Sequence, residues 1–94
     1  WEELSRRLRK ALEEARASGK RLDVVQQNAE LADRIYTIAR QRFEAGAIDA
    51  LELERSEVAR TQAQVAVVEQ RLQRVQSLIQ VEHILGIELE ETPW

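Results

Sequence analysis

The stretch Arg40-Gln-Arg-Phe-Glu-Ala-Gly-Ala-Ile-Asp-Ala-Leu-Glu-Leu-Glu54 decides the fold, because it holds both a helix stop and a helix start. Gly46 suits the left-handed position just past a helix end, which favours a residue without a side chain. Asp49 is a good N-cap, and Glu52 three residues later completes the pattern of a capping box. One helix therefore ends, the chain reverses within a few residues, and a second helix begins.

The sequence predicts an antiparallel helical hairpin, a long coiled coil folded back at this turn. Ile48 and Leu53 take the N′ and N4 positions of a hydrophobic staple, which fixes how the chain enters the second helix. Gly86 is placed to end that helix as a C′ residue. We therefore expect a single all-α domain over residues 1–94, with a helix at 2–44, a turn at 45–49, a helix at 50–85 and a tail at 86–94.

Apolar and small residues recur every seven residues along the first helix, as in a coiled coil. The two series are Leu8, Ala15, Leu22, Ala29, Tyr36 and Phe43, and Leu4, Ala11, Ser18, Val25, Ala32 and Ala39. Alanine and serine dominate them, so the helix axes can approach more closely than in a leucine-rich coiled coil. Ser18-Gly19 interrupts the run of helix formers, and both a continuous helix and a local bend or break remain open.

The second helix carries its own seven-residue series, which we expect to face the first helix. Its members are Leu51, Val58, Val65, Leu72, Ile79 and Gly86, partnered by Thr61, Val68, Val75 and Glu82. Each helix also has a second apolar row, at Val24, Leu31, Ile35 and Ile38, and at Ala63, Ala66, Val67, Leu78, Val81 and Leu85. A lone hairpin needs only one contact face, so these rows predict self-association into a four-helix dimer or a larger, α-barrel-like bundle.

Composition excludes several classes of function. A third of the residues are charged, 4% are aromatic and the net charge is −3, which is typical of long helices and shows no basic face for nucleic acid. The absence of cysteine excludes disulfides and thiolate metal sites. No run of about eighteen apolar residues occurs, so we expect no membrane span and a chain that is itself soluble.

Candidate catalytic and metal-binding groups are few. They are the lone histidine His83 with Glu82, Glu88 and Glu90, and the acidic trio Glu52, Glu54 and Glu57 after the turn. One imidazole among helix-surface carboxylates is a weak metal signal. Acidic residues in the first turns of a helix are explained by the helix dipole. With no glycine-rich phosphate loop and no Ser/His/Asp set, the sequence predicts no enzyme, no cofactor and no metal.

Four short motifs occur in order along the chain. They are Arg42-Phe43-Glu44-Ala45-Gly46, Leu51-Glu52-Leu53-Glu54-Arg55-Ser56, Ala63-Gln64 and Ile84-Leu85-Gly86. In order and spacing they resemble the outer-membrane efflux protein family, the TolC-type channels, whose hairpins carry Arg-Tyr-x-x-Gly, a Leu-Asp-x-x-Arg-like stretch, an Ala/Gln-rich helix and a closing Leu-Gly. Phe43 stands where the family has Tyr, and Glu52 where it has Asp. The first helix fits more loosely, so the resemblance covers nearly the whole chain, as the periplasmic hairpin of the second repeat.

The resemblance implies a structural role in transport. In such channels three chains pack their helices into a twelve-helix periplasmic tunnel, whose tips dock an adaptor protein that joins an inner-membrane pump. Carried over, the docking tip would comprise Arg42, Phe43, Gly46, Ala47, Ile48 and Asp49. Glu52 would occupy an acidic constriction position, and Arg55 falls where some members have a second acid. The parent protein would then lie in the outer membrane and the periplasm.

Three other readings of the sequence stay open. The α-hairpin of the periplasmic adaptor itself also has a tip like Gly46-Ala47-Ile48-Asp49, although the Ile84-Leu85-Gly86 ending favours the channel. An engineered coiled-coil scaffold fits the repeats, but polar residues at Asn28, Gln62 and Glu82 are irregular for an idealised design. A natural stand-alone dimerisation module is the remaining alternative.

Overall fold

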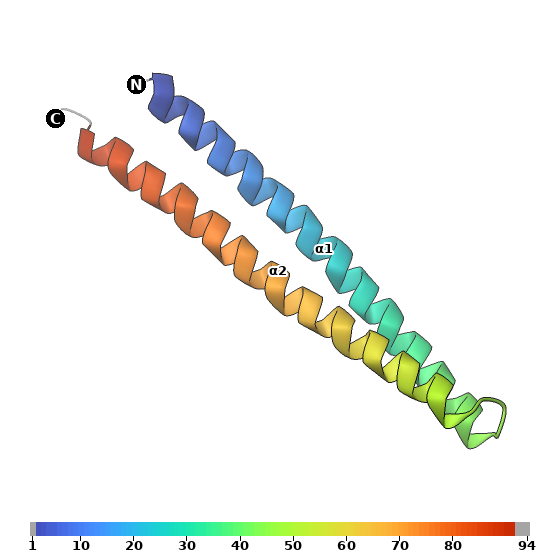
Figure 1. The fold of residues 1–94 in the computed structure, drawn as a ribbon. Helices are drawn as coiled ribbons and strands as arrows, with labels where there is room; N and C mark the ends of the chain where they lie inside the picture. The colour runs from blue at the N-terminus through green and yellow to red at the C-terminus, as the bar shows by residue number, and fades with distance from the viewer. Residues whose placement is uncertain (1, 92–94) are drawn as a thin grey trace. The chain divides into compact units, whose positions relative to one another are not determined.

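The computed structural model contains two long α-helices joined by a short turn (Figure 1). It describes the backbone of residues 2–91 and the side chains of residues 2–87. Helix α1 spans Glu2–Glu44 and helix α2 spans Ala50–Glu91, and no strand occurs within residues 2–91. The all-α prediction is confirmed.

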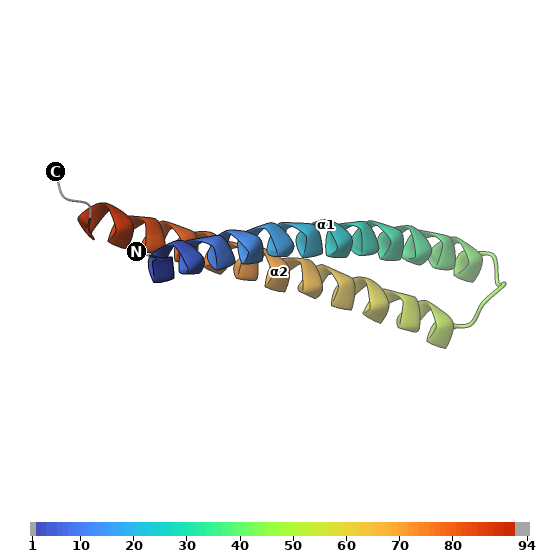
Figure 2. The ribbon, with the colours of Figure 1, turned by 90° about the horizontal axis from the view of Figure 1, so that it is seen from above.

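The residues group into two compact units. The turn unit, Asp23–Glu69, contains the second half of α1, the turn and the first half of α2, and the terminal unit contains Trp1–Leu22 and Gln70–Trp94. Within each unit the segments of α1 and α2 lie side by side and run in opposite directions (Figures 1 and 2). The turn unit is therefore a helical hairpin in its own right.

The end of α2 differs from the prediction. Gly86 lies inside the helix with a negative φ, and α2 continues to Glu91, so the predicted helix end at 85 and the predicted tail over residues 86–91 were wrong. Residues 92–94 of that predicted tail lie outside the described residues. The physical reason lies on either side of the glycine. Ile84 is buried and Ile87 is half-buried, and both line the side of α2 that faces α1. Continued packing keeps the helix intact across a residue that would cost only about 1 kcal/mol relative to alanine.

The contact face of α1 is the predicted one. Its two seven-residue series are buried or half-buried from Leu4 to Ala39. The exception is Phe43, which is 40% exposed because it lies in the last turn of α1, next to the chain reversal. Ser18 and Gly19 lie within a continuous helix, which excludes a break at that point.

The contact face of α2 is not the predicted one. The predicted series is exposed at Leu51, Val58, Val65, Val68, Leu72, Val75 and Ile79. The residues that face α1 instead are Leu53, Ser56, Arg60, Ala63, Val67, Gln70, Arg74, Ser77, Val81 and Ile84, all buried or half-buried. The two sets differ by two positions, which corresponds to about 200° around the helix and hence to nearly the opposite face.

Two arginines allow this more polar face of α2 to pack against α1. In the turn unit, Nε of Arg60 lies 2.8 Å from Oδ1 of Asp33, and its guanidinium carbon lies 4.9 Å from the centre of the Tyr36 ring. In the terminal unit, Nη1 of Arg74 donates a hydrogen bond of 3.1 Å to the carbonyl oxygen of Ala15. The hydrogen bond satisfies one N–H of Arg74, whereas Nε of Arg60 is held near Asp33 by charge and makes no hydrogen bond.

The glycine on α1 is what makes room for Arg74. A Cβ added to Gly19 would collide with Nη1 of Arg74, so the guanidinium lies directly over the glycine. The neighbouring Ser18 is fully buried, and its hydroxyl donates a hydrogen bond of 2.8 Å to the same Ala15 carbonyl. The small residues Ser18 and Gly19 therefore leave the space that the Arg74 guanidinium of the facing helix occupies.

The apolar side chains that do not face the other helix form outer rows on both helices. On α1 the predicted second row, Val24, Leu31, Ile35 and Ile38, is about half exposed. The predicted second row on α2 is only partly exposed. Ala63, Val67 and Val81 belong to the contact face and Ala66 is half-buried beside it, whereas Leu78 and Leu85 are exposed. We call the exposed series from Leu51 to Ile79 the outer row of α2.

Candidate functional site at the turn

The end of α1 forms a complete Schellman motif around Gly46. The amide of Ala47 donates to the carbonyl of Arg42 at 2.8 Å, and the amide of Gly46 donates to the carbonyl of Phe43 at 3.0 Å. This pair of hydrogen bonds defines the motif and places Gly46 at C′. Its φ of 77° is the left-handed conformation that the sequence predicted for this residue.

The start of α2 is capped by Asp49. The amide of Glu52 donates a hydrogen bond of 2.9 Å to Oδ1 of Asp49, and the amide of Leu53 donates to the Asp49 carbonyl at 3.3 Å. The predicted capping box is half formed, since within the described residues the Glu52 carboxylate makes no return bond to the Asp49 amide. Ile48 and Leu53 are both half-buried, as the predicted staple requires. The turn is thus capped on both sides, by backbone hydrogen bonds at the end of α1 and by the Asp49 side chain at the start of α2.

A shallow groove lies beside the turn, within the turn unit. Its apolar lining comes from Ile35 and Ile38 of α1 and from Ile48, and its charged lining comes from Arg42 of α1 and Glu52 of α2. The groove therefore offers three branched aliphatic side chains together with one cation and one carboxylate. A surface of this kind can take an apolar side chain and fix its orientation through neighbouring polar groups.

The predicted tip residues divide into two sets. Arg42, Ile48 and Glu52 are brought together around the groove. Phe43, Gly46, Ala47 and Asp49 are exposed on the turn, and Arg55 is exposed one turn further along α2. Ile35 and Ile38 also line the groove, although the sequence suggested them only as part of a second apolar row. Their spacing from Arg42, at seven and four residues, is the signal that could have placed them on the same face.

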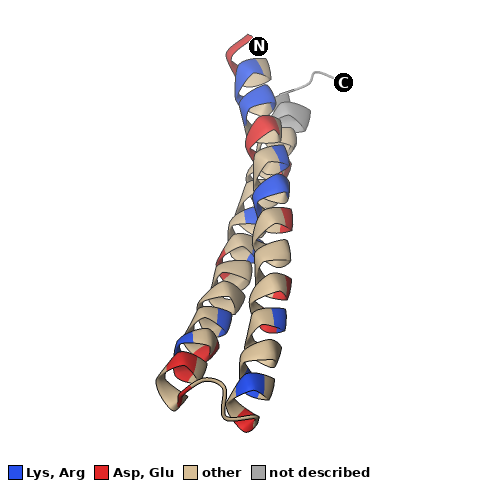
Figure 3. Cartoon of the chain, turned by 90° about the vertical axis from the view of Figure 1, so that its right-hand side faces the viewer, with Lys and Arg blue, Asp and Glu red and all other residues tan. Residues whose placement is uncertain are grey.

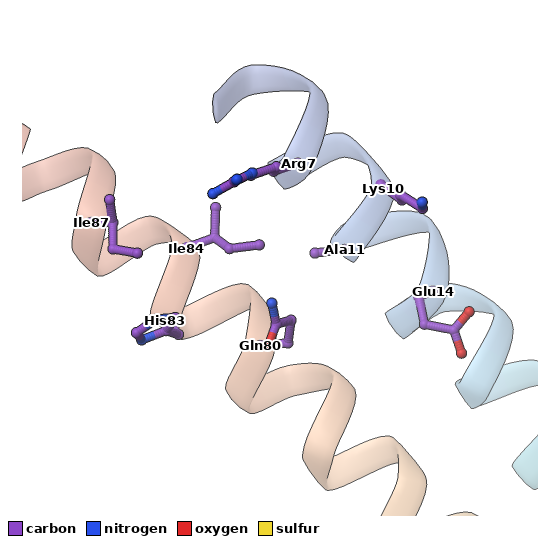
Figure 4. A pocket seen from close by; sticks show the side chains of 8 residues that line it. All are labelled: Arg7, Lys10, Ala11, Glu14, Gln80, His83, Ile84 and Ile87. Carbon is purple, nitrogen blue, oxygen red and sulfur yellow. The ribbon is translucent and has the colours of Figure 1, made fainter. Parts of the chain in front are cut away.

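A second groove, in the terminal unit, was not predicted from sequence. It is lined by apolar Ala11, Ile84 and Ile87 with Arg7, Gln80 and His83 among the polar residues (Figure 4). Ile84 points across it toward Ala11, and Arg7 extends from α1 toward α2. His83 is thus part of a mixed surface, and no group of three metal-binding side chains forms among the residues that the structure describes.

Charges are interspersed along both helices in the view of Figure 3. Several form ion pairs at the surface of α1, including Arg7 with Glu3 at 3.5 Å, Arg21 with Glu14 at 2.7 Å and Arg40 with Glu44 at 3.4 Å. Each exposed pair of this kind stabilises a helix by roughly a few tenths of a kcal/mol. None of the described helical stretches is both long and apolar enough to cross a bilayer.

Comparison with known proteins gives one match. The family model for outer membrane efflux proteins matches residues 2–87, which include α1, the capped turn and α2 as far as Ile87. Neither a curated protein nor a solved structure matches the chain.

Proposed function

Because this chain belongs to the outer membrane efflux protein family, we propose that it forms a periplasmic helical hairpin of a TolC-like efflux channel and that its turn docks an adaptor protein. The observation that carries the docking proposal is the turn itself. It is closed by a Schellman motif on one side and an aspartate cap on the other, and the groove with Ile48, Arg42 and Glu52 lies beside it. The role is one of transport and assembly rather than catalysis.

The chemistry of the groove specifies the partner. A helical tip that presents one aliphatic side chain would bury it against Ile38 and Ile48. Polar groups next to that side chain would meet the guanidinium of Arg42 and the carboxylate of Glu52, which lie on different helices. A pre-formed surface of this kind loses little conformational entropy on binding, which favours docking between two rigid hairpins.

The outer rows support self-association of the hairpin. Glu54 and Arg55 each lie in line with Leu51 and Val58, and Glu69 lies in line with Val65 and Leu72, so the outer row of α2 carries charges of both signs. On α1, Lys20 lies one turn before Val24 and Arg42 one turn after Ile38, so the outer row of that helix carries basic ones. The exposed apolar side chains of both rows, with charges beside them, favour packing of one copy against another.

The proposed constriction differs from one made of two acids. Glu52 and Arg55 are three residues apart at the start of α2, so they lie on neighbouring parts of the helix surface. A ring of such pairs from several hairpins would contain both signs of charge. We therefore expect weaker selection between cations and anions than a purely acidic ring would give.

Binding to purified periplasmic hairpins tests the docking proposal. The chain should bind adaptor hairpins, and the charge reversals Arg42→Glu and Glu52→Arg should each weaken that binding. Arg34→Glu and Glu57→Arg are the matched controls, because both positions are exposed and neither lines the groove. Binding to channel hairpins in place of adaptor hairpins would support the adaptor alternative and overturn this proposal.

A further inference from the structure

Helix α2 packs against α1 with a more polar face than the one it leaves exposed. Its contact face includes Arg60, Gln70 and Arg74, whereas its outer row consists of leucine, valine and isoleucine at seven-residue spacing. Burial of apolar surface is the main favourable term in helix packing, and it would turn the outer row toward α1. Some feature of the hairpin must therefore favour the more polar face.

The feature that favours the polar face is a pair of arginine contacts. Arg60 reaches Asp33 and Tyr36, and Arg74 reaches the Ala15 carbonyl over Gly19. The two arginines are fourteen residues apart on α2, and their counterparts Asp33 and Gly19 are fourteen residues apart on α1. Because fourteen residues are two heptads, each arginine meets α1 in the same antiparallel register.

The contact of Arg74 also depends on small side chains in the contact face of α1. Arg74 lies over a residue without a side chain and beside the fully buried Ser18. Larger residues there would occupy the space of the guanidinium. The sequences of the two helices are therefore matched, because each arginine of α2 meets a site on α1 that can receive it.

We infer that Arg60 and Arg74 select the face of α2 that turns toward α1 and thereby keep the outer row of α2 free to bind a second copy of the chain. The use of that row rests on the self-association proposed above, whereas the selection of the face does not. The arginines are positioning residues, since they act on the orientation of a helix and do not themselves form the outer surface.

Thiol labelling of single-cysteine variants can report which face of α2 points outward, because the chain contains no cysteine of its own. Val65 in the outer row is 49% exposed, and Val67 in the contact face is 9% exposed. At a dilution where sedimentation velocity gives a monomer, Val65→Cys should react with a maleimide faster than Val67→Cys. In the Arg60→Glu/Arg74→Glu background the order of the two rates should reverse, because glutamate repels Asp33 and cannot donate to the Ala15 carbonyl.

The matched control is Arg55→Glu/Arg71→Glu, which makes the same change in charge at two exposed positions of α2. It should leave the ratio of the two labelling rates unchanged. The inference is overturned if the ratio in the Arg60→Glu/Arg74→Glu background stays at its original value, or if the control changes it equally. A reversed ratio in a chain that remains monomeric at high concentration would support the face selection and contradict the proposed self-association.

A second variant covers the case in which the double glutamate chain does not fold. Gly19→Ala raises helix propensity but displaces Arg74, whereas Gly86→Ala raises it equally with no neighbour within 4 Å. Labelling at Ile79→Cys and Val81→Cys, on the outer and contact faces of the terminal unit, should become more alike in the Gly19→Ala background only. An unchanged pair of rates there would overturn the role assigned to Arg74.

Discussion

The guanidinium of Arg60 stacks over the ring of Tyr36, with its central carbon 4.9 Å from the ring centre. Arg60 comes from α2 and Tyr36 from α1, so the contact joins the two helices of the turn unit. On the same guanidinium, Nε lies close to Asp33 but its N–H does not point at the carboxylate, which makes this an ion pair rather than a well-formed hydrogen bond. A half-buried cation is thus shared between an aromatic face and an acid.

Removing this cation should destabilise the hairpin. We expect Arg60→Ala to lower the free energy of unfolding by about 1 kcal/mol, the sum of a cation–π contact and a partly exposed ion pair. A double-mutant cycle with Asp33→Ala, followed by urea denaturation, would measure the ion-pair part, which should weaken at high salt. Tyr36→Phe keeps the ring and should have a smaller effect than Tyr36→Leu. Equal losses for the two tyrosine variants would contradict the stacking contribution.

Two glycines should respond to alanine in opposite directions. Gly46→Ala should destabilise the hairpin by about 1 kcal/mol or more, because an L side chain is strained at its φ of 77°. Gly86→Ala should stabilise it by about 1 kcal/mol, because that glycine lies inside a helix with open space around it. Thermal unfolding at one fixed chain concentration measures both. A stabilising Gly46→Ala would show that the turn does not keep the Schellman motif in solution.

The cap on α2 should contribute a measurable part of the stability. Asp49→Ala removes the acceptor for the Glu52 amide and should cost about 1 kcal/mol. Asp49→Asn retains an oxygen acceptor and should cost less. Asp23→Ala is the matched control, since it removes an exposed carboxylate from the middle of α1. Chemical denaturation of the three variants would rank them, and equal effects of Asp49→Ala and Asp23→Ala would exclude a capping role.

The outer row of α2 should control self-association. Val65→Glu places a charge in the middle of that row and should shift the chain toward monomer, as measured by sedimentation equilibrium. Gln64→Glu, at the adjacent exposed position, makes a similar side chain outside the row and should leave the oligomeric state unchanged. Loss of helicity with Val65→Glu at low concentration would instead indicate that Val65 supports the monomer fold.

The turn and the contact face of α1 could be predicted from sequence because each depends on local chemistry. Gly46 acts through backbone hydrogen bonds around it and Asp49 through its side-chain carboxylate, each within a few residues of its own position. The contact series of α1 runs along the helix from Leu4 to Ala39, whereas the competing row with Val24, Leu31 and Ile38 covers only its second half. The docking roles of the turn residues and the constriction role of Glu52 and Arg55 stay predictions.

The contact face of α2 could not be predicted because it depends on pairs of residues far apart in the sequence. Apolarity alone favours the series with Val58 and Val65 as the contact face. It does not take account of the hydrogen bond from Arg74 to a carbonyl that lies 59 positions earlier in the sequence. The same limit applies to Gly86, where the nearby packing of Ile84 outweighs the local tendency of glycine to end a helix.

The alanines and the serine along α1 determine which kinds of substitution the hairpin tolerates. Most helix interfaces are damaged when a large side chain is shortened and a cavity opens. Ala11, Ala15 and Ser18 already have small side chains, so shortening them would remove little volume. The damaging changes at these positions are enlargements that push the helices apart. Distance between the helices, rather than the amount of apolar surface buried, is the property that this face maintains.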